Sequence, residues 1–508
     1  MADTATTTEA VPETVADLLG GHGRGPSIVT VDGASIDHEA LVARVGQLAE
    51  RFRSAGLGPG DRIAVVLPNG PEMALVLLAA MSVGCAAPLN PKYREDEFRF
   101  YLDDLRAAAL VTNPGESPAA HAAAPSSTLA IDVSGSGLSI DLTVPDAGSP
   151  ADRPRRDGVP LPDDQALVLH TSGTTSRPKI VPLRQRNLAR SARNIAAHLQ
   201  LSPSDRSLTV MPLFHIHGIM AGLLAPLSAG AAVVCTPGFD AFKFHRWVDE
   251  LQPTYYTAVP TMHQMVLARA PKEHRPTSLR FVRSSSASLP VTVLESLGAL
   301  FDVPVVEAYG MTEASHQMTC NPLPPGVQKP GSVGIPTGIE VAILDPANHV
   351  LPAGQRGEVG IRGATVVDGY ENNPEANASA FTDGWFRTGD EGMLDDDGYL
   401  FLTGRLKEQI NRGGEKVSPL EVDDVLLRHP AVAEAVTFAI PHPKLGEEIG
   451  AVVVLAEGEE LSERDLRTFA GEQLAAFKVP EKIVFVEAIP KGATGKVQRI
   501  GMADRLGL

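Results

Sequence analysis

The sequence predicts an α/β protein with a large amino-terminal domain of layered, mostly parallel sheets and helices, followed by a small α+β domain. Short apolar runs alternate with segments of helical periodicity along most of the chain, as they do where helices connect parallel strands. The 508 residues exceed what a single core usually covers. The pattern changes near Gly404, so we divide the chain into domains of residues 1–404 and 405–508.

The amino-terminal elements are expected in the order helix, strand, helix, strand, strand. Residues 37–57 have helical periodicity and end near a glycine suited to a helix C-cap. Residues 61–68, 85–91 and 108–113 read as short buried strands, and residues 70–84 read as a helix between the first two. The Ala-, Pro-, Ser- and Gly-rich stretch from 113 to 164 is expected to be a surface excursion with weak structure.

The carboxyl-terminal module is expected to contain two helices and three strands. Residues 418–441 read as a helix followed by a strand, and residues 449–458 as a second strand. A helix over 462–477 and a strand over 482–490 complete the module.

Composition favours a cytoplasmic enzyme without nucleic-acid or membrane partners. The net charge of −17, from 61 acidic and 44 basic residues, disfavours non-specific nucleic-acid binding. Cys85, Cys235 and Cys320 lie far apart and form no CxxC pair, which is typical of a reducing compartment. The first residues lack the features of a secretory signal, and no apolar stretch is long enough to span a bilayer.

The stretch "HTSGTTSRPK", residues 170–179, follows an apolar strand and has the character of a phosphate loop. Backbone N–H groups and hydroxyls around Gly173 suit phosphate oxygens, and Lys179 supplies the counter-charge. The spacing is not that of a Walker loop. Taken alone, the stretch fits a flexible Ser/Thr-rich connection equally well.

Three further segments carry polar residues in positions that suit a nucleotide. Tyr309 offers an aromatic face for a base, and Glu313 offers an oxygen ligand for Mg²⁺. Asp390 lies in a Gly-flanked turn, where a carboxylate can accept from ribose hydroxyls, and Lys496 lies in a Gly-flanked loop. Each has an ordinary alternative as a core tyrosine, a hairpin turn or a surface lysine.

The order and spacing of these segments resemble the acyl- and aryl-CoA synthetases of the acyl-adenylate-forming (ANL) superfamily. The segments that carry the resemblance are "TSGTTSRPK", "PLFHIHG", "YGMTE", "WFRTGD", "GRLKEQINRGGEK" and "PKGATGK", with "GLGPGDRIAVVLPNGPE" extending it toward the amino terminus. Two positions depart from the usual pattern, because Ser176 and Ile180 stand where glycine is common.

The resemblance implies that a carboxylate is activated by ATP with Mg²⁺ and then transferred to coenzyme A. It implies catalytic roles for Lys496, Thr312, Glu313 and His215, with Mg²⁺ held by Glu313. The ATP contacts that it implies are Thr171, Ser172, Gly173, Thr174, Thr175, Lys179, Glu307, Ala308, Tyr309, Gly310, Thr312, Asp390, Arg405 and Lys496.

The resemblance also implies that the small carboxyl-terminal domain is mobile and rotates between the two half-reactions. Lys407 matches the hinge position of the family. Gly413 and Gly414 match the loop beside the pantetheine of coenzyme A, where glycine allows close backbone approach.

The expected acyl pocket is polar. The family builds this pocket from three segments, and here they carry "PLFHIHG", "RSSSASLP" and "TEASHQM". Buried hydroxyls and imidazoles need partners, and the distal carboxylate of a small diacid would accept from both, with histidinium adding charge near neutral pH. The residues assigned to the substrate are His215, His217, Ser285, Ser286 and His316, with Ser285 the favoured serine.

The stretch around His316 is similar to that of the oxalate–CoA ligases, so oxalate is the predicted acid. A ligase for malonate, acetate, or a fatty or aryl acid stays open, although no arginine for a malonate carboxylate is identifiable by spacing. A stand-alone enzyme that loads a carrier protein and a non-catalytic nucleotide sensor are further alternatives. The chain is expected to act as a monomer or a homodimer.

Overall fold

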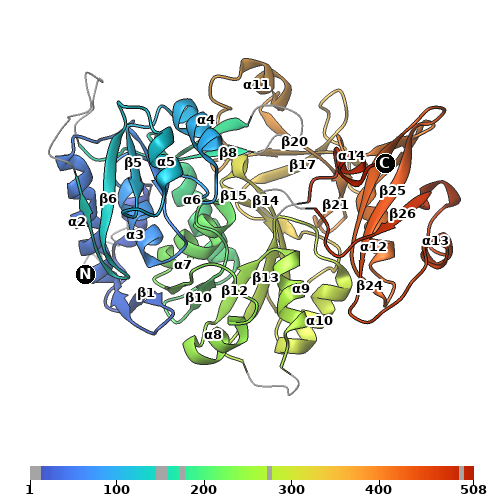
Figure 1. Ribbon diagram of the computed structural model, residues 1–508, viewed down its shortest axis with the longest axis horizontal. Helices are drawn as coiled ribbons and strands as arrows, with labels where there is room; N and C mark the ends of the chain where they lie inside the picture. The colour runs from blue at the N-terminus through green and yellow to red at the C-terminus, as the bar shows by residue number, and fades with distance from the viewer. Residues whose placement is uncertain (1–12, 145–157, 172–177, 272–276, 491–496) are drawn as a thin grey trace, which may run out of the picture.

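The computed structural model describes residues 13–144, 158–171, 178–271, 277–490 and 497–508. Two large sheets form the amino-terminal and central parts, and two smaller sheets follow. In Figure 1 the chain runs from the first large sheet on the left to the carboxyl-terminal sheet on the right. The predicted α/β class is confirmed by this arrangement.

The first large sheet has seven strands in the order β7-β6-β5-β3-β4-β8-β9. The strands from β6 to β8 are parallel, and the two edge strands are antiparallel. Its members are β3 (Arg62–Val66), β4 (Cys85–Pro88), β5 (Ala109–Thr112), β6 (Leu129–Ser136), β7 (Ser139–Thr143), β8 (Gln165–Thr171) and β9 (Lys179–Arg184). The predicted strands 61–68, 85–91 and 108–113 are therefore confirmed.

The prediction of weak structure between residues 113 and 164 is wrong for much of that stretch. The stretch contains helix α5 (Pro118–Ala123) and strands β6 and β7. Strand β6 extends the first sheet in parallel to β5, and β7 forms its antiparallel edge. Strand β6 begins with alternating buried and exposed residues, as a half-covered strand requires. The edge of β5 supplies backbone partners, which outweigh the poor strand propensity of Ala, Gly and Ser.

The second large sheet has nine strands in the order β16-β15-β14-β13-β12-β10-β11-β1-β2, and the six from β14 to β1 are parallel. Its members are β1 (Pro26–Thr30), β2 (Ser35–Asp37), β10 (Arg206–Thr209), β11 (Ala232–Cys235), β12 (Tyr255–Ala258), β13 (Phe281–Ser285), β14 (Val305–Met311), β15 (His316–Cys320) and β16 (Ile335–Pro336). Helices α8 (Phe244–Leu251), α9 (Pro260–Ala268) and α10 (Val291–Phe301) cover one face.

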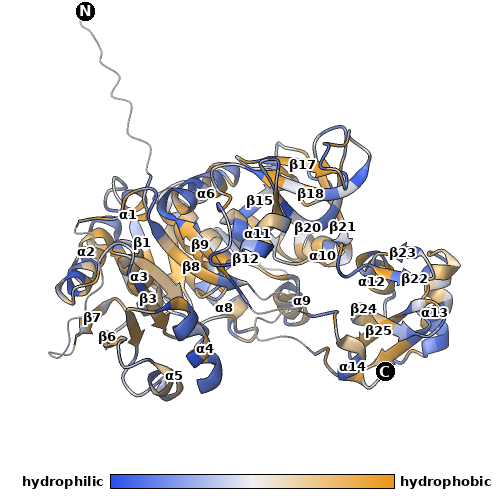
Figure 2. Cartoon of the chain, turned by 90° about the horizontal axis from the view of Figure 1, so that it is seen from above, coloured by the Kyte–Doolittle hydropathy of each residue, from blue (hydrophilic) through white to orange (hydrophobic). Residues whose placement is uncertain are grey.

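The main hydrophobic core lies between the two large sheets. Helix α3 (Pro71–Met81) contacts strands of both sheets, and its side chains from Met73 to Met81 are fully buried. A helix that is apolar on all sides is stable only in such a position. Figure 2 shows hydrophobic residues along β8 and β9 and hydrophilic residues on the outer helix α4 (Glu95–Leu105). Helices α2 (His38–Ser54) and α6 (Gln185–His198) also contribute to this core.

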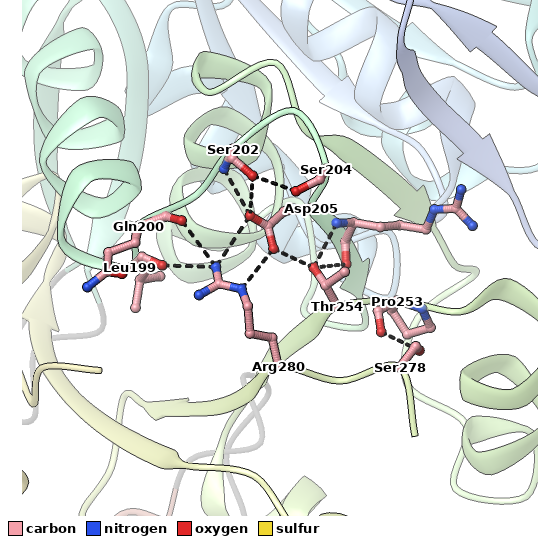
Figure 3. A network of polar contacts seen from close by, with 10 residues as sticks. Leu199, Gln200, Ser202, Ser204, Asp205, Pro253, Thr254, Ser278 and Arg280 are labelled. Atoms are coloured by element: carbon pink, nitrogen blue, oxygen red, sulfur yellow. Dashed lines mark hydrogen bonds and ion pairs between the residues drawn. The ribbon is translucent and has the colours of Figure 1, made fainter. Parts of the chain in front are cut away.

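The amino ends of three neighbouring parallel strands are tied together by one buried carboxylate. Asp205 precedes β10 and pairs with Arg280, which precedes β13, at 3.1 Å. The hydroxyl of Thr254, which precedes β12, donates to the same carboxylate at 2.8 Å. Figure 3 shows this network, which Ser202 completes. The carboxyl ends of these strands are the opposite edge, where ligand sites of parallel sheets lie.

The two smaller sheets follow in the chain. The first is antiparallel and contains β17 (Glu340–Leu344), β18 (Arg356–Arg362), β19 (Phe381–Thr382), β20 (Trp385–Leu394) and β21 (Leu400–Arg405). The second contains β22 (Ile410–Arg412), β23 (Glu415–Val417), β24 (Val432–His442), β25 (Gly446–Leu455) and β26 (Lys482–Phe485). Helices α12 (Pro419–Leu426) and α13 (Glu463–Gly471) pack on this last sheet. The predicted order of elements from residue 418 to 490 is confirmed.

No helix in the described part of the chain is both long enough and apolar enough to cross a membrane.

Candidate active site

The candidate site lies at the carboxyl end of strand β14. After Met311 the chain makes one 3₁₀ turn, Thr312–Ala314, and returns as β15 beside β14. A Cβ atom on Gly310 would lie 2.1 Å from the carbonyl oxygen of His316, so only glycine fits this close approach. The "YGMTEASH" stretch thereby places Tyr309, Glu313 and His316 around one tight reversal.

Three of the residues predicted to contact ATP lie together. The Tyr309 hydroxyl donates to the Asp390 carboxylate, and the Arg405 guanidinium lies 3.2 Å from the same group. Asp390 and Arg405 are register partners of the antiparallel pair β20 and β21. Burial raises the pKa of Asp390, while Arg405 and Tyr309 oppose that rise. The pKa of Arg405 is raised, chiefly by the charge of Asp390.

Glu313 and Lys179 meet at a shared tyrosine. The hydroxyl of Tyr370 donates to the buried Glu313 carboxylate at 2.7 Å. The Lys179 ammonium lies 4.3 Å from the centre of the same ring. Burial lowers the pKa of Lys179, the charge of Glu313 opposes this, and the charge of Lys407 adds to it. A carboxylate and an ammonium on one aromatic ring suit an anionic ligand that carries a cation.

The residues around Glu313 fit a magnesium ion that takes most of its ligands from phosphate and water. In the described ranges no group of three or more histidine, cysteine, aspartate or glutamate side chains forms a metal cage. A single buried carboxylate is what Mg²⁺ needs when a phosphate accompanies it. Glu313 is thus the group that would hold the ion.

Four polar side chains form a second cluster, which we call the acyl-side cluster: His217, Arg283, Ser286 and His316. The His217 and His316 rings are stacked with centroids 4.8 Å apart. Nδ1 of His217 lies 3.0 Å from the Ser286 hydroxyl. Arg283 is fully buried and reaches Nε2 of both rings at 3.2 Å. His217 and His316 are buried as well, whereas Ser286 is half-buried.

Arg283 is the member of the acyl-side cluster that the sequence analysis did not identify. It stands directly before the serines of "RSSSASLP", in a strand of five buried residues, "FVRSS". A charged residue in such a strand is rare without a partner. That local signal could have identified Arg283, although the rings it contacts lie 33 and 66 residues away.

The backbone is strained at the acyl-side cluster. Ser286, Ser315 and His316 have φ angles of 76°, 53° and 90°, in the left-handed region that non-glycine residues seldom adopt. The carbonyl of Ser315 accepts from Ser191 at 2.6 Å, and its hydroxyl donates to the Thr365 carbonyl at 2.8 Å. Such strain persists only where surrounding contacts impose it, and it is concentrated at functional sites.

The remaining predicted acyl residues lie next to the cluster. The Ser285 hydroxyl donates its proton to the backbone carbonyl of Ala308 at 2.8 Å, between β13 and β14. The half-buried His215 accepts from the His217 backbone N–H through Nδ1, at 3.3 Å, where the π-helical segment η1 (Gly218–Leu224) is about to begin. Ser285 therefore stabilises the sheet, and His215 stabilises the approach to η1.

Glu307 is held inside the fold. Its carboxylate accepts from the Leu289 backbone N–H at 2.8 Å. Burial raises its pKa to about 8, and the nearby charge of Asp424 in α12 also raises it. Glu307 and Ala308 therefore belong to the buried part of β14, directly before the half-buried residues from Tyr309 to Thr312.

The residues predicted to form the phosphate loop and the predicted catalytic lysine lie largely outside the described residues. Thr171 and Lys179 are register partners that close the hairpin of β8 and β9. Ser172, Gly173, Thr174, Thr175 and Lys496 lie outside the described residues.

The predicted hinge residue lies between the third and fourth sheets, and the predicted loop glycines lie within the fourth sheet. Lys407 is exposed just after β21. Gly413 and Gly414 connect β22 to β23 with φ angles of 63° and 98°. A two-residue hairpin turn with two positive φ angles requires glycine-like residues at both positions.

The chain matches two family models. The model described as AMP-binding enzyme matches residues 21–371, and the model described as AMP-binding enzyme C-terminal domain matches residues 421–496. The chain belongs to the AMP-binding enzyme family. The resemblance to acyl-adenylate-forming acyl-CoA synthetases is thereby confirmed.

Named relatives cover nearly the whole of this AMP-binding enzyme. It is 48% identical over 472 residues to the oxalate–CoA ligase of Arabidopsis thaliana, covering 90% of this chain and 91% of that protein. It is 42% identical to the oxalate–CoA ligase of Saccharomyces cerevisiae, covering 87% and 86%. Among solved structures, ATP-bound MatB from Rhodopseudomonas palustris matches with a TM-score of 0.84 and 29% identity, covering 97% and 99%.

Proposed function

We propose that this protein is an ATP-dependent oxalate–CoA ligase that releases AMP and pyrophosphate. The observation that carries the proposal is the acyl-side cluster, in which an arginine, two imidazoles and a serine hydroxyl converge beside Glu313. Buried donors of this kind are costly unless an acceptor satisfies them. A second carboxylate supplies such an acceptor, and the oxalate–CoA ligases are relatives at 48% and 42% identity.

In the first step one oxygen of the substrate carboxylate attacks the α-phosphorus of ATP. A bond forms between them, the bond from the α-phosphorus to the pyrophosphate oxygen breaks, and an acyl-adenylate results. Two anions must meet, so a cation at the point of attack lowers the barrier. We assign this role to Lys496, on the resemblance. Mg²⁺ held at Glu313 would neutralise charge on the phosphates.

In the second step the sulfur of coenzyme A attacks the acyl carbon, loses its proton to solvent, and displaces AMP. We assign the ribose hydroxyls to Asp390 and Arg405, and the adenine ring to the face of Tyr309. Lys179, Thr312 and the preceding Ser/Thr-rich loop would contact the phosphates. The bond from Tyr309 to Asp390 supports this set, because it fixes the ring beside the carboxylate.

We propose that residues 405–508 rotate as a mobile domain between the two steps, with Lys407 at the hinge. Among the described residues, polar contacts join the two parts: Arg405 pairs with Asp390, the Ser418 hydroxyl donates to the Thr403 carbonyl, and Gln264 donates to the Ala433 carbonyl at 3.2 Å. Interfaces of this type permit relative motion. Gly413 and Gly414 would then approach the pantetheine chain.

The proposal places the enzyme in the cytoplasm as a monomer or a homodimer. Cys85, Cys235 and Cys320 are unpaired and buried, as suits a reducing compartment.

The test is CoA-dependent AMP release with ATP, Mg²⁺ and a panel of oxalate, malonate, acetate, hexanoate and coumarate. We expect kcat/KM for oxalate to exceed that for acetate, hexanoate and coumarate by roughly a hundredfold or more, since a site built for a polar group rejects analogues that lack it. It should also exceed that for malonate, which keeps the second carboxylate but is longer. Preference for hexanoate or coumarate would refute the substrate assignment. It would leave adenylation chemistry intact.

A further inference from the structure

Arg283 is a fully buried cation held by hydroxyl, amide and imidazole side chains. Its guanidinium donates to the Thr257 hydroxyl at 2.9 Å and to the Gln317 side-chain oxygen at 2.8 Å. It also reaches Nε2 of His217 and of His316. In the described part of the chain no aspartate or glutamate pairs with it. A buried charge without a counter-ion is unusual, because its desolvation is uncompensated.

The geometry of the guanidinium determines which ring nitrogens carry protons. A guanidinium can only donate hydrogen bonds, so the Nε2 atom of each ring must be the acceptor. The Thr257 hydroxyl, 2.6 Å from Nε2 of His217, then donates its proton to that atom while it accepts from Arg283. The proton of His217 is left on Nδ1, which donates to Ser286 at 3.0 Å. Nε2 of His217 thus accepts from both Thr257, at 2.6 Å, and Arg283, at 3.2 Å, and the shorter contact is the one to Thr257.

The same contacts oppose charging of either ring. An imidazolium would direct its Nε2 proton at a guanidinium that is also a donor. The two rings are stacked with centroids 4.8 Å apart, so a positive charge on either ring would be repelled by the charge of Arg283. Neighbouring titratable groups do not offset this, because burial raises the pKa of Cys320 to about 12 and raises that of Tyr255. Burial also lowers the pKa of the nearby His198. The single positive charge of the cluster therefore stays on Arg283.

We propose that Arg283 is a positioning residue for substrate choice: it holds His217 and His316 as neutral rings with their protons on Nδ1, and its unbalanced charge selects an acid with a second carboxylate. This inference rests on the proposed function for the identity of that acid. The proton of His217 is then directed at Ser286, and both rings are neutral rather than the histidinium groups expected from sequence. The anionic tail of the substrate supplies the missing counter-charge.

The first test is made on the unaltered protein labelled with ¹⁵N-histidine. Long-range ¹H–¹⁵N spectra distinguish the two neutral tautomers and the charged ring, and His217→Gln and His316→Gln identify the two signals by their loss. We expect both rings to be Nδ1-protonated and neutral from about pH 8 to about pH 6, where an ordinary histidine titrates. A charged ring or an Nε2-protonated ring at either position would overturn the proposal, whatever acid the enzyme prefers.

The second test compares Arg283→Met and Arg283→Lys with Arg280→Met, which removes an arginine next to the same strand but away from the cluster. In Arg283→Met we expect kcat/KM for oxalate to fall about a hundredfold, with that for acetate changed only a few-fold. Oxalate turnover should then recover as the pH falls through about 6.5, since histidinium can replace the lost charge. Arg283→Lys should restore the charge but not the forked contact, and so rescue only part of the loss.

The outcomes separate this proposal from the proposed function. Equal loss with oxalate and acetate, or a pH profile parallel to that of the unaltered enzyme, would show that Arg283 acts only on folding. Arg280→Met should leave the ratio of oxalate to acetate turnover unchanged. If the unaltered enzyme prefers a monocarboxylic acid while both rings are neutral Nδ1 tautomers, the oxalate assignment and the charge-selection step fail, and the positioning of the rings stands.

Discussion

Replacement of Gly310 by alanine tests whether the tight reversal of β14 into β15 sets the geometry of the site. A methyl group there would place Cβ 2.1 Å from the carbonyl oxygen of His316 and 2.7 Å from its carbonyl carbon. Non-bonded carbon and oxygen atoms seldom approach below roughly 3 Å, so the two strands must separate by about 1 Å. Gly310 pairs with Gln317 and Met311 with His316, so the displacement enters the acyl-side cluster directly.

A shift of about 1 Å in a positioned group can lower a rate about a hundredfold. We therefore expect kcat/KM for oxalate to fall by about that factor in Gly310→Ala. The assay is oxalate-dependent release of pyrophosphate from ATP, with thermal unfolding measured on the same preparations. The variant should still fold, because the large cores on either side of the sheet are untouched.

Gly298→Ala is the matched control. Gly298 lies inside helix α10, and a Cβ atom there would come no closer than 3.8 Å to its nearest neighbour. The substitution should leave activity unchanged and stabilise the protein by about 1 kcal/mol, the usual gain for alanine over glycine in a helix. A folded Gly310→Ala protein with activity within about threefold of the unaltered enzyme would refute the reasoning.

Three further predictions concern the catalytic lysine, a buried acid and the opposite edge of the sheet. Lys496→Ala should slow adenylation about 10²–10³-fold in a pyrophosphate-release assay while sparing thioester formation from pre-made acyl-adenylate, and equal loss of both steps would contradict its role. Because burial raises the pKa of Glu307 to about 8, its protonated form stabilises the fold fully at low pH and this stability is lost as the pH rises through about 8. Glu307→Gln should therefore raise the melting temperature at about pH 9 and leave it unchanged at about pH 5; the same shift at both values would rule out titration as the cause. Asp205→Ala should lower the free energy of unfolding, measured in urea, by about 2 kcal/mol, because Arg280 and Thr254 lose their shared acceptor. Asp205→Asn keeps an acceptor oxygen, so an equally large loss in that variant would show that the charge matters rather than the hydrogen bonds.

Much of the fold was predictable, because helices and strands depend on near neighbours in the chain. Strand β3, helix α3 and the five elements from residue 418 to 490 lie where periodicity placed them. Strands β6 and β7 were missed because their composition is poor for strands, and their stability comes from the edge of β5. Pairing between distant segments is not readable from local composition.

The candidate site was predictable as a set of residues but less so as a set of bonds. The bond from Tyr309 to Asp390 joins two residues that the resemblance had already assigned to ATP. The Ser285 hydroxyl, favoured as a substrate contact, donates instead to the Ala308 carbonyl across the sheet. Ser286, one residue later, has a positive φ angle and its hydroxyl lies beside His217.

The sequence by itself determined the α/β class, the family motifs and the polar character of the acyl side. The tertiary structure alone decided which hydrogen-bond partners those polar groups have. Arg283 meets Thr257, His316, Gln317 and His217 across separations of 26, 33, 34 and 66 residues. The physical reason is that local pattern sets the period of a strand, whereas the register of neighbouring strands sets the partner of every donor.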